Sequence, residues 1–343
     1  MYSDDDLNAA VTAGVLTPDA AAALRSFVAS QRATPAVDEE HFRLLTGFND
    51  IFVAIAATLI LLAMGWLGGA ANGIGGIAVA VTSWGLAEYF TRRRRMALPS
   101  IILLIGFIAG VSIAVTGFIH PVDLFMRNAT ALHDGRGVLL ALPAAAGAIG
   151  ACLHWWRFRV PITVAAGAVA VTGLITSLSY ALLPSMASAA RPILLACGLA
   201  VFALAMGWDM SDRTRVTRRS DVAFWLHLSA APMIVHPIFG MLGLLGHGET
   251  DIDKAATAVA IYLALALVAL MIDRRALLVS ALIYVLYAIS ALLRAAGSLS
   301  ASFALTALII GSALLLLSAF WHRARRAVVE PLPAGMKNRL PAI

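Results

Sequence analysis

The sequence predicts an all-α protein: a polytopic transmembrane helix bundle of about ten spans, with both termini cytoplasmic and a short N-terminal amphipathic helical region. Three observations lead to this fold class. The chain of 343 residues is 61% hydrophobic and 13% charged, whereas soluble domains are about 45–50% apolar. Its apolar residues form long segments, and arginines gather in every second turn between them. The segments are continuously apolar rather than alternating, which favours helices over the strands of a closed barrel.

Each apolar segment is long enough to cross the hydrocarbon core of a bilayer, which takes about 20 mostly apolar residues. The boundaries divide the chain into a cytosolic N-terminal helical module (1–46), a transmembrane helical bundle (47–322) and a cytosolic C-terminal tail (323–343). We place the spans near residues 48–67, 74–91, 98–119, 137–154, 161–183, 191–207, 222–245, 255–272, 276–294 and 302–321.

The arginines also predict which side each turn faces. Every second turn is rich in arginine. The turns between these hold few cations, and carboxylates lie beside those cations. The positive-inside rule therefore places the arginine-rich turns in the cytoplasm. The abundance of alanine and arginine, with only Lys254 and Lys337 as lysines, is typical of a bacterial protein, so we expect the bacterial inner membrane. The basic turns carry Arg92, Arg93, Arg94, Arg95, Arg157, Arg159, Arg213, Arg215, Arg218, Arg219, Arg274 and Arg275, and the tail adds Arg323, Arg325 and Arg326.

Tryptophans lie beside these basic turns, where interfacial indoles are expected; they are Trp155, Trp156, Trp208 and Trp321. The turns recur about every 60 residues, the scale of one helical hairpin. This spacing suggests an ancient hairpin duplication. The alternative is the ordinary regularity of any polytopic protein.

The N-terminal module carries its own helix signals. One short helix is expected to end near Gly14, and Thr17-Pro18-Asp19 reads as an N-cap, a proline at the first helical position and an acidic first turn. A module this small cannot build a robust core alone. We therefore expect it to pack on the membrane face or on a cytosolic protein partner.

The seventh span contains the candidate cavity or ligand residues, which are His227, Ser229, Pro232, His236 and Pro237. Each proline frees a backbone carbonyl about one turn earlier, and ionisable groups at membrane depth often line pathways. One interpretation is a kinked helix beside a polar cavity, with His236 as ligand or proton carrier. The other is a neutral histidine bonded to a neighbouring helix. The two histidines are nine residues apart and fall on opposite helix faces.

Other polar residues predict little chemistry. Glu88 is expected to pair with Arg92 at i+4. The outer turns collect His120, Asp123, His133, Asp134, His247, Glu249, Asp251 and Asp253. Histidine with carboxylate suits a divalent metal, but no tight ligand spacing occurs, and a solvated acidic loop is the simpler account. No catalytic, cofactor or metal motif is predicted.

Two further features concern packing and charge. The third span carries Gly106, Gly110 and Ala114 on one stripe, and small residues four apart let helices approach closely. We interpret this stripe as an internal packing seam. The net charge of +6 follows from the turns that set topology, so we expect the lipid bilayer and not nucleic acid as the partner of the charged residues.

The opening Ala13-Gly14-Val15-Leu16-Thr17-Pro18-Asp19-Ala20, followed by a short helix and serial spans, resembles a family of uncharacterised bacterial polytopic predicted membrane proteins. The resemblance implies a small cytosolic N-terminal helical module and about eight to ten spans. It implies no activity.

Three functions are compatible with these features. The first is a small-solute permease or translocation protein, supported by the span count and the histidine-bearing seventh span. The second is a non-transporting membrane scaffold or sensor whose N-terminal module binds a cytosolic partner. The third is an integral membrane enzyme acting on lipid or cell-wall intermediates, which would need a cluster of polar residues at one interface.

The arginine distribution yields the first testable prediction. Reporter fusions after residues 130 and 250 should read outside, and fusions after residues 215 and 335 should read inside, because positively charged turns stay in the cytoplasm. An odd number of spans, seen as opposite readings for early and late basic turns, would contradict this topology.

Overall fold

The computed structural model describes residues 4–31, 48–69, 73–119, 137–182, 189–213, 215, 217–243, 252–295, 302–337 and 340–341. These residues are helical apart from short turns, and no strand occurs among them. The chain divides into two compact units, Met1–His41 and Phe42–Ile343. The predicted all-α class is confirmed, and each unit is described by itself.

The N-terminal unit is a pair of short helices, α1 (Asp4–Thr12) and α2 (Pro18–Gln31). Gly14 ends the first helix in a left-handed conformation with φ of 72°, which glycine adopts without strain. The Thr17 hydroxyl accepts a hydrogen bond from the Ala20 amide at 3.2 Å. Both helix signals read from the sequence are therefore confirmed.

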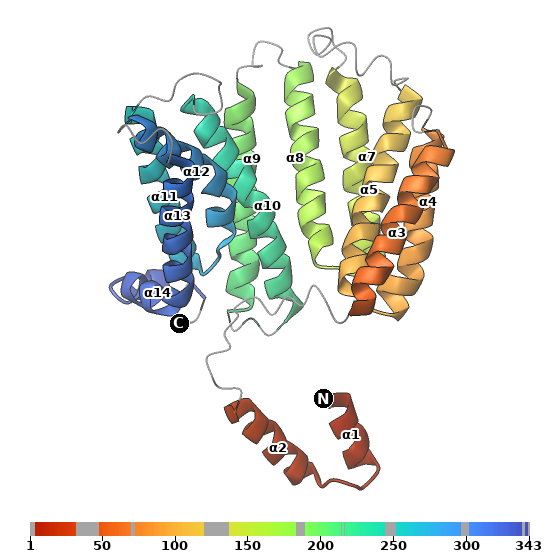
Figure 1. Cartoon of the computed structure of the whole chain (residues 1–343). Coiled ribbons are helices and arrows are strands. Elements are labelled where there is room, and N and C mark those ends of the chain that lie inside the picture. Colours follow the sequence, from red (N-terminus) through yellow and green to blue (C-terminus); the bar gives the residue numbers. More distant parts are fainter. Residues whose placement is uncertain are drawn as a thin grey trace. The chain divides into compact units, whose positions relative to one another are not determined.

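The second unit is a bundle of long apolar helices (Figure 1). Its elements in order are α3 (Phe48–Leu67), α4 (Ile74–Ala87), the π-helical turn η2 (Glu88–Arg93), α5 (Ala97–Ile119), α7 (Gly137–Phe158), α8 (Ile162–Leu182), α9 (Ala190–Ser211), α10 (Arg218–Met241), α11 (Ile252–Ile272), α12 (Ala276–Ala295), α13 (Ser302–Ala319), α14 (Trp321–Val329) and α15 (Ala334–Lys337).

Within the described residues, six helices are long and apolar enough to cross a membrane, namely α3, α5, α8, α9, α10 and α11. The bent pair of α13 and α14 makes a seventh if it counts as one span. Large apolar side chains such as Phe52, Leu59 and Leu62 are exposed on α3, as a lipid-facing surface requires. By length and composition these are the helices of a multi-pass membrane protein.

Short basic turns join the helices into hairpins: α4 to α5 through η2, α7 to α8, α9 to α10 and α11 to α12. Figure 1 shows these turns at the lower end of the bundle, which we call the basic end. Among the residues that the structure describes, each turn has one non-glycine residue in the left-handed region, Arg95, Arg159, Arg215 or Asp273, with φ between 53° and 60°. This conformation costs an L-residue about 1–2 kcal/mol, so four repeats of it at the same kind of turn indicate a common turn geometry.

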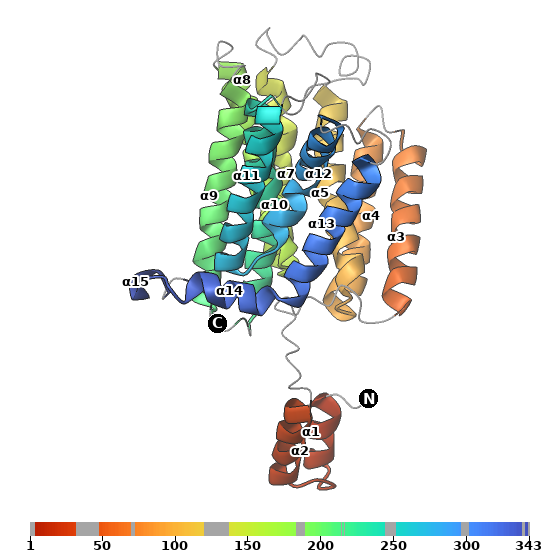
Figure 2. The ribbon, with the colours of Figure 1, turned by 60° about the vertical axis from the view of Figure 1, so that its left-hand side comes forward.

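Two elements differ from the predicted continuous spans. The second span is α-helical only to Ala87 and ends in the π-helical turn η2. The last span ends at Ala319, and α14 leaves α13 at an angle of 73°. Figure 2 shows α14 lying across the basic end of the bundle. The predicted tail therefore begins within a helix, whose Arg325 and Val329 are buried.

Glycines set the closest helix contact in the first half of the bundle. A Cβ atom at Gly76 of α4 would lie 2.3 Å from the Ala114 backbone nitrogen of α5, and one at Gly110 would lie 2.7 Å from the Ala80 nitrogen. The backbones of α4 and α5 therefore touch directly, which only glycine permits at these positions. The predicted packing seam of the third span is confirmed, and its partner is the helix before it.

Replacing Gly76 by Ala should destabilise the bundle by about 1–3 kcal/mol, because the added methyl group forces the two backbones apart. Gly85→Ala on the same helix is the matched control, since a Cβ there meets nothing within 4 Å and alanine favours helix by about 1 kcal/mol. The comparison is the melting temperature of each variant in detergent. Equal melting temperatures for the two variants would show that the close approach is not needed.

Candidate functional site

The most buried charges in the described bundle lie together at the basic end. Asp209 of α9, His227 of α10 and Arg274 of the turn between α11 and α12 are each at most 2% exposed. An Arg274 Nη2 donates to Asp209 Oδ1 at 2.6 Å, and His227 Nε2 lies 2.9 Å from Asp209 Oδ2. One carboxylate thus joins residues from three parts of the chain.

Local structure explains why these three side chains meet. Asp209 lies in the last turn of α9, where the negative end of the helix dipole disfavours a carboxylate unless a cation is close. Arg274 supplies that cation and also donates to the Ser220 carbonyl at 3.3 Å, in the first turn of α10. An unpaired charge at this burial would cost several kcal/mol. The pair therefore fixes α9, α10 and the turn before α12 relative to one another.

A second carboxylate lies next in sequence to Arg274 and faces another way. Asp273 Oδ2 accepts from Arg215 Nη1 at 3.0 Å, and its Oδ1 accepts from the Trp321 indole nitrogen at 2.8 Å. Arg325 of α14 lies 3.5 Å from the same Oδ1. Asp273 is 4% exposed. This carboxylate binds α14 to the turn between α9 and α10.

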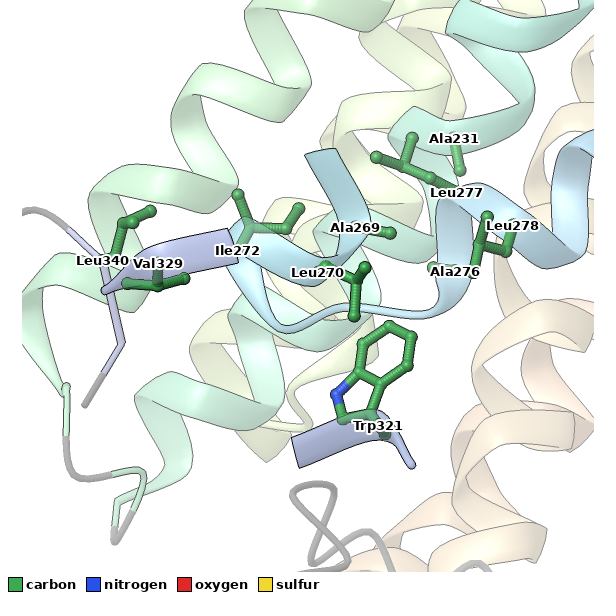
Figure 3. Packing of buried hydrophobic residues seen from close by; sticks show 10 residues of the cluster. All are labelled: Ala231, Ala269, Leu270, Ile272, Ala276, Leu277, Leu278, Trp321, Val329 and Leu340. Atoms are coloured by element: carbon green, nitrogen blue, oxygen red, sulfur yellow. The ribbon is translucent and has the colours of Figure 1, made fainter. Parts of the chain in front are cut away.

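Apolar packing shields these polar bonds from water. Figure 3 shows the Trp321 indole directed toward Leu270 and Ala276, which flank the turn that holds Asp273 and Arg274. All three belong to one buried cluster. Exclusion of water strengthens the charge interactions that the cluster covers. We call the residues Asp209, Arg215, His227, Asp273, Arg274, Trp321 and Arg325 the basic-end network.

The first half of the bundle has a simpler counterpart. Glu88, at the start of η2, accepts two hydrogen bonds from Arg157 in the last turn of α7, at 2.6 and 2.9 Å. Arg92 also donates to Glu88 at 3.3 Å, so the pair expected at i+4 is confirmed. The bonds from Arg157 were not predicted, because Arg157 lies 69 residues from Glu88 in the sequence.

Another buried histidine lies in the same half. His154 of α7 is fully buried, and its Nδ1 lies 3.1 Å from the Thr163 hydroxyl of α8. Aromatic rings surround it, the closest being Phe158 at 4.6 Å between centroids. The sequence analysis had not singled out His154.

The structure separates the candidate residues predicted in the seventh span. His227 is buried in the basic-end network, whereas His236 is exposed and its Nδ1 lies 2.8 Å from the Tyr284 hydroxyl of α12. The expected placement of the two histidines on opposite faces of the helix is confirmed.

The remaining candidates of that span do not form one site with His236. Pro232 is exposed and Pro237 is buried. Both prolines lie inside the continuous helix α10. The Ser229 hydroxyl is used locally, since it donates to the Leu226 carbonyl at 3.0 Å.

The metal alternative falls mostly outside the described residues. His120, Asp123, His133, Asp134, His247, Glu249 and Asp251 lie there, and only Asp253 of that set is described. In the part of the chain that the structure covers, no group of three or more histidine, cysteine or carboxylate side chains is placed to hold a metal ion.

Sequence reasoning missed the partners of the basic-end network. It assigned Arg215 and Arg274 to topology, and it gave no role to Asp209 or Asp273. The available signal was a carboxylate within four residues of an arginine cluster, as in Asp209 before Arg213 and Asp273 before Arg274. A carboxylate in a turn that must stay positive needs a structural reason.

Comparisons of the chain with protein-family models, with curated proteins and with solved structures found no match. The resemblance to a family of uncharacterised bacterial membrane proteins therefore stays a prediction. The site must be interpreted from its own geometry.

Removing one partner of the buried ion pair between Asp209 and Arg274 should lower the stability of the bundle far more than removing one partner of an exposed ion pair. Arg274→Met leaves the Asp209 carboxylate desolvated, and we expect a loss of about 3–5 kcal/mol. Arg92→Ala is the control, because its ion pair with Glu88 has an arginine that is 54% exposed, and such pairs contribute at most about 1 kcal/mol. The measurement is resistance to unfolding in mixed micelles.

The double variant Asp209→Leu with Arg274→Met should recover part of that loss, because an apolar replacement of a buried pair removes both desolvation costs. No recovery would mean that Arg274 acts through its other bond, to the Ser220 carbonyl.

Proposed function

We propose that this chain is a ten-span protein of a bacterial inner membrane, with both termini cytoplasmic, that acts as a non-transporting scaffold or sensor. In this proposal the N-terminal unit binds a cytosolic protein. The positive turns of the basic end support the orientation. The ten apolar segments of the sequence support the span count. Among the described helices, six or seven are long and apolar enough to be spans.

The observation that carries the proposal is the separate N-terminal unit. Met1–His41 forms its own compact body, yet its two short helices bury few apolar residues, such as Leu7 and Ala21. Val15 is 78% exposed and Phe27 is 58% exposed. Exposed large apolar side chains on so small a unit favour a protein partner that covers them.

The polar groups of the membrane unit also favour a structural role. The prominent buried charges pair across the bundle, as Asp209 of α9 does with Arg274 and as Asp273 does with Arg215 of another turn. Bonds of this kind hold helices in place. A permease needs polar groups that are available to a solute.

A small-solute permease is the second candidate, and His236 favours it. This histidine is exposed on α10, the most buried of the candidate spans. A pathway along this face would place a titratable group in contact with solute. Its hydrogen bond to Tyr284 serves equally well as a link between α10 and α12.

Photo-crosslinking in living cells separates the two candidates. A photoreactive amino acid at position 15 or 27 should give a discrete adduct with one cytosolic protein, because those side chains are exposed. The same group at position 21 is the matched control, since Ala21 is 1% exposed, and it should give none.

The permease instead requires water at position 236. The chain's two cysteines, Cys152 and Cys197, are free and are removed first. In that background, His236→Cys would react with a small charged thiol reagent as fast as Lys254→Cys, which lies on the exposed start of α11. Absence of adducts at positions 15 and 27, together with rapid labelling at 236, would replace the scaffold proposal by the permease.

A further inference from the structure

A groove opens between α12 and α13 at the basic end of the bundle. Its volume is about 200 Å³, and its walls are mostly aliphatic, with Leu282 on one side and Leu314 and Leu317 on the other. An apolar groove on the outside of a membrane helix pair suits a hydrocarbon chain. Its aliphatic walls alone do not select one lipid over another.

Polar residues close the basic end of this groove. Arg275, Ser318 and Trp321 line it there. The Arg275 guanidinium lies over the Trp321 ring at 4.8 Å from the centroid, so the cation is held in place by a cation–π contact. The groove therefore runs from aliphatic walls to an oriented arginine, which is the polarity of a phospholipid.

The charge of Arg275 differs from that of its neighbours. Arg274 and Arg215 are neutralised by Asp209 and Asp273. Arg275 has no ion pair among the residues that the structure describes. An oriented guanidinium without a carboxylate is a strong binder of phosphate, because its parallel N–H groups match two phosphate oxygens.

The same three residue types line a second groove at the basic end. Arg219, Trp208 and Ser211 line it, beside Leu204 of α9. Arginine near the membrane surface attracts anionic headgroups, and tryptophan prefers the headgroup level. The recurrence of this set in two hairpins supports headgroup binding as its common use.

We infer that the groove between α12 and α13 binds one anionic phospholipid, with an acyl chain between Leu282, Leu314 and Leu317 and the phosphate on Arg275. The Ser318 hydroxyl is placed at the same end to donate to a headgroup oxygen. This site depends on the membrane location of the chain and is independent of the scaffold proposal. Its ligand would bridge α12 and α13 close to the start of α14.

Native mass spectrometry of the delipidated full chain tests the site. An Arg219→Ala background removes the arginine of the second groove, and the probes are phosphatidylglycerol and phosphatidylcholine with identical acyl chains. The background protein should bind phosphatidylglycerol about fivefold more tightly, since one arginine near the headgroup contributes about that factor. Arg275→Ala should abolish the preference, and Arg275→Lys should keep part of it.

Two matched controls locate the effect. Arg326→Ala removes an exposed arginine of α14 that lines neither groove, and it should leave the preference unchanged. Leu314→Trp fills the groove and should weaken both lipids. Leu315→Trp, one residue along α13 and 74% exposed, should weaken neither.

Two results would overturn the inference. One is an unchanged preference in Arg275→Ala, which would mean that Arg275 does not bind the headgroup. The other is displacement of phosphatidylglycerol by an equal concentration of glycerol phosphate, which has no acyl chain. That outcome would identify a soluble phosphate site instead of a lipid site.

Discussion

A buried charge must meet an opposite charge, and this constraint organises the second half of the bundle. Asp209 lies at the end of α9 with almost no exposed surface, so its carboxylate is tolerable only while Arg274 and His227 are in place. The turn before α12 is therefore held against α9 and α10. The position of α14 follows in turn, because Asp273 is the residue before Arg274.

Three consecutive residues of one turn bind different groups, and Asp273 and Arg275 both contact Trp321. Asp273 points to α14, Arg274 points to α9 and α10, and Arg275 lies over the Trp321 ring at the groove between α12 and α13. The left-handed conformation of Asp273 sets the chain direction at the start of this run. A single tight turn thus connects the interior charges with the groove that we assign to lipid. Binding of lipid in the groove and packing of α14 therefore both depend on the conformation of this turn.

The features that could be predicted from the sequence are those that depend on residues close together along the chain. The cap at Thr17, the pair of Glu88 with Arg92 and the glycine stripe of α5 all follow from spacings of a few residues. The pair of Asp209 with Arg274 spans 65 residues, and no local pattern encodes it. Trp321 shows the same limit: the expected interfacial indole is 1% exposed and bonds to Asp273, because α14 turns back onto the bundle. Four left-handed residues in the basic turns add a geometric regularity to the hairpin repeat inferred from arginine spacing.

The break between α13 and α14 has a consequence for how the protein is made. Trp321 and Arg325 contact Asp273, and a ribosome synthesises them about 50 residues after that carboxylate. Until then Asp273 has Arg215 but lacks its two partners from α14. Completion of the fold is thus linked to the arrival of one late helix, and a nascent chain that ends before α14 leaves Asp273 without two of its three partners.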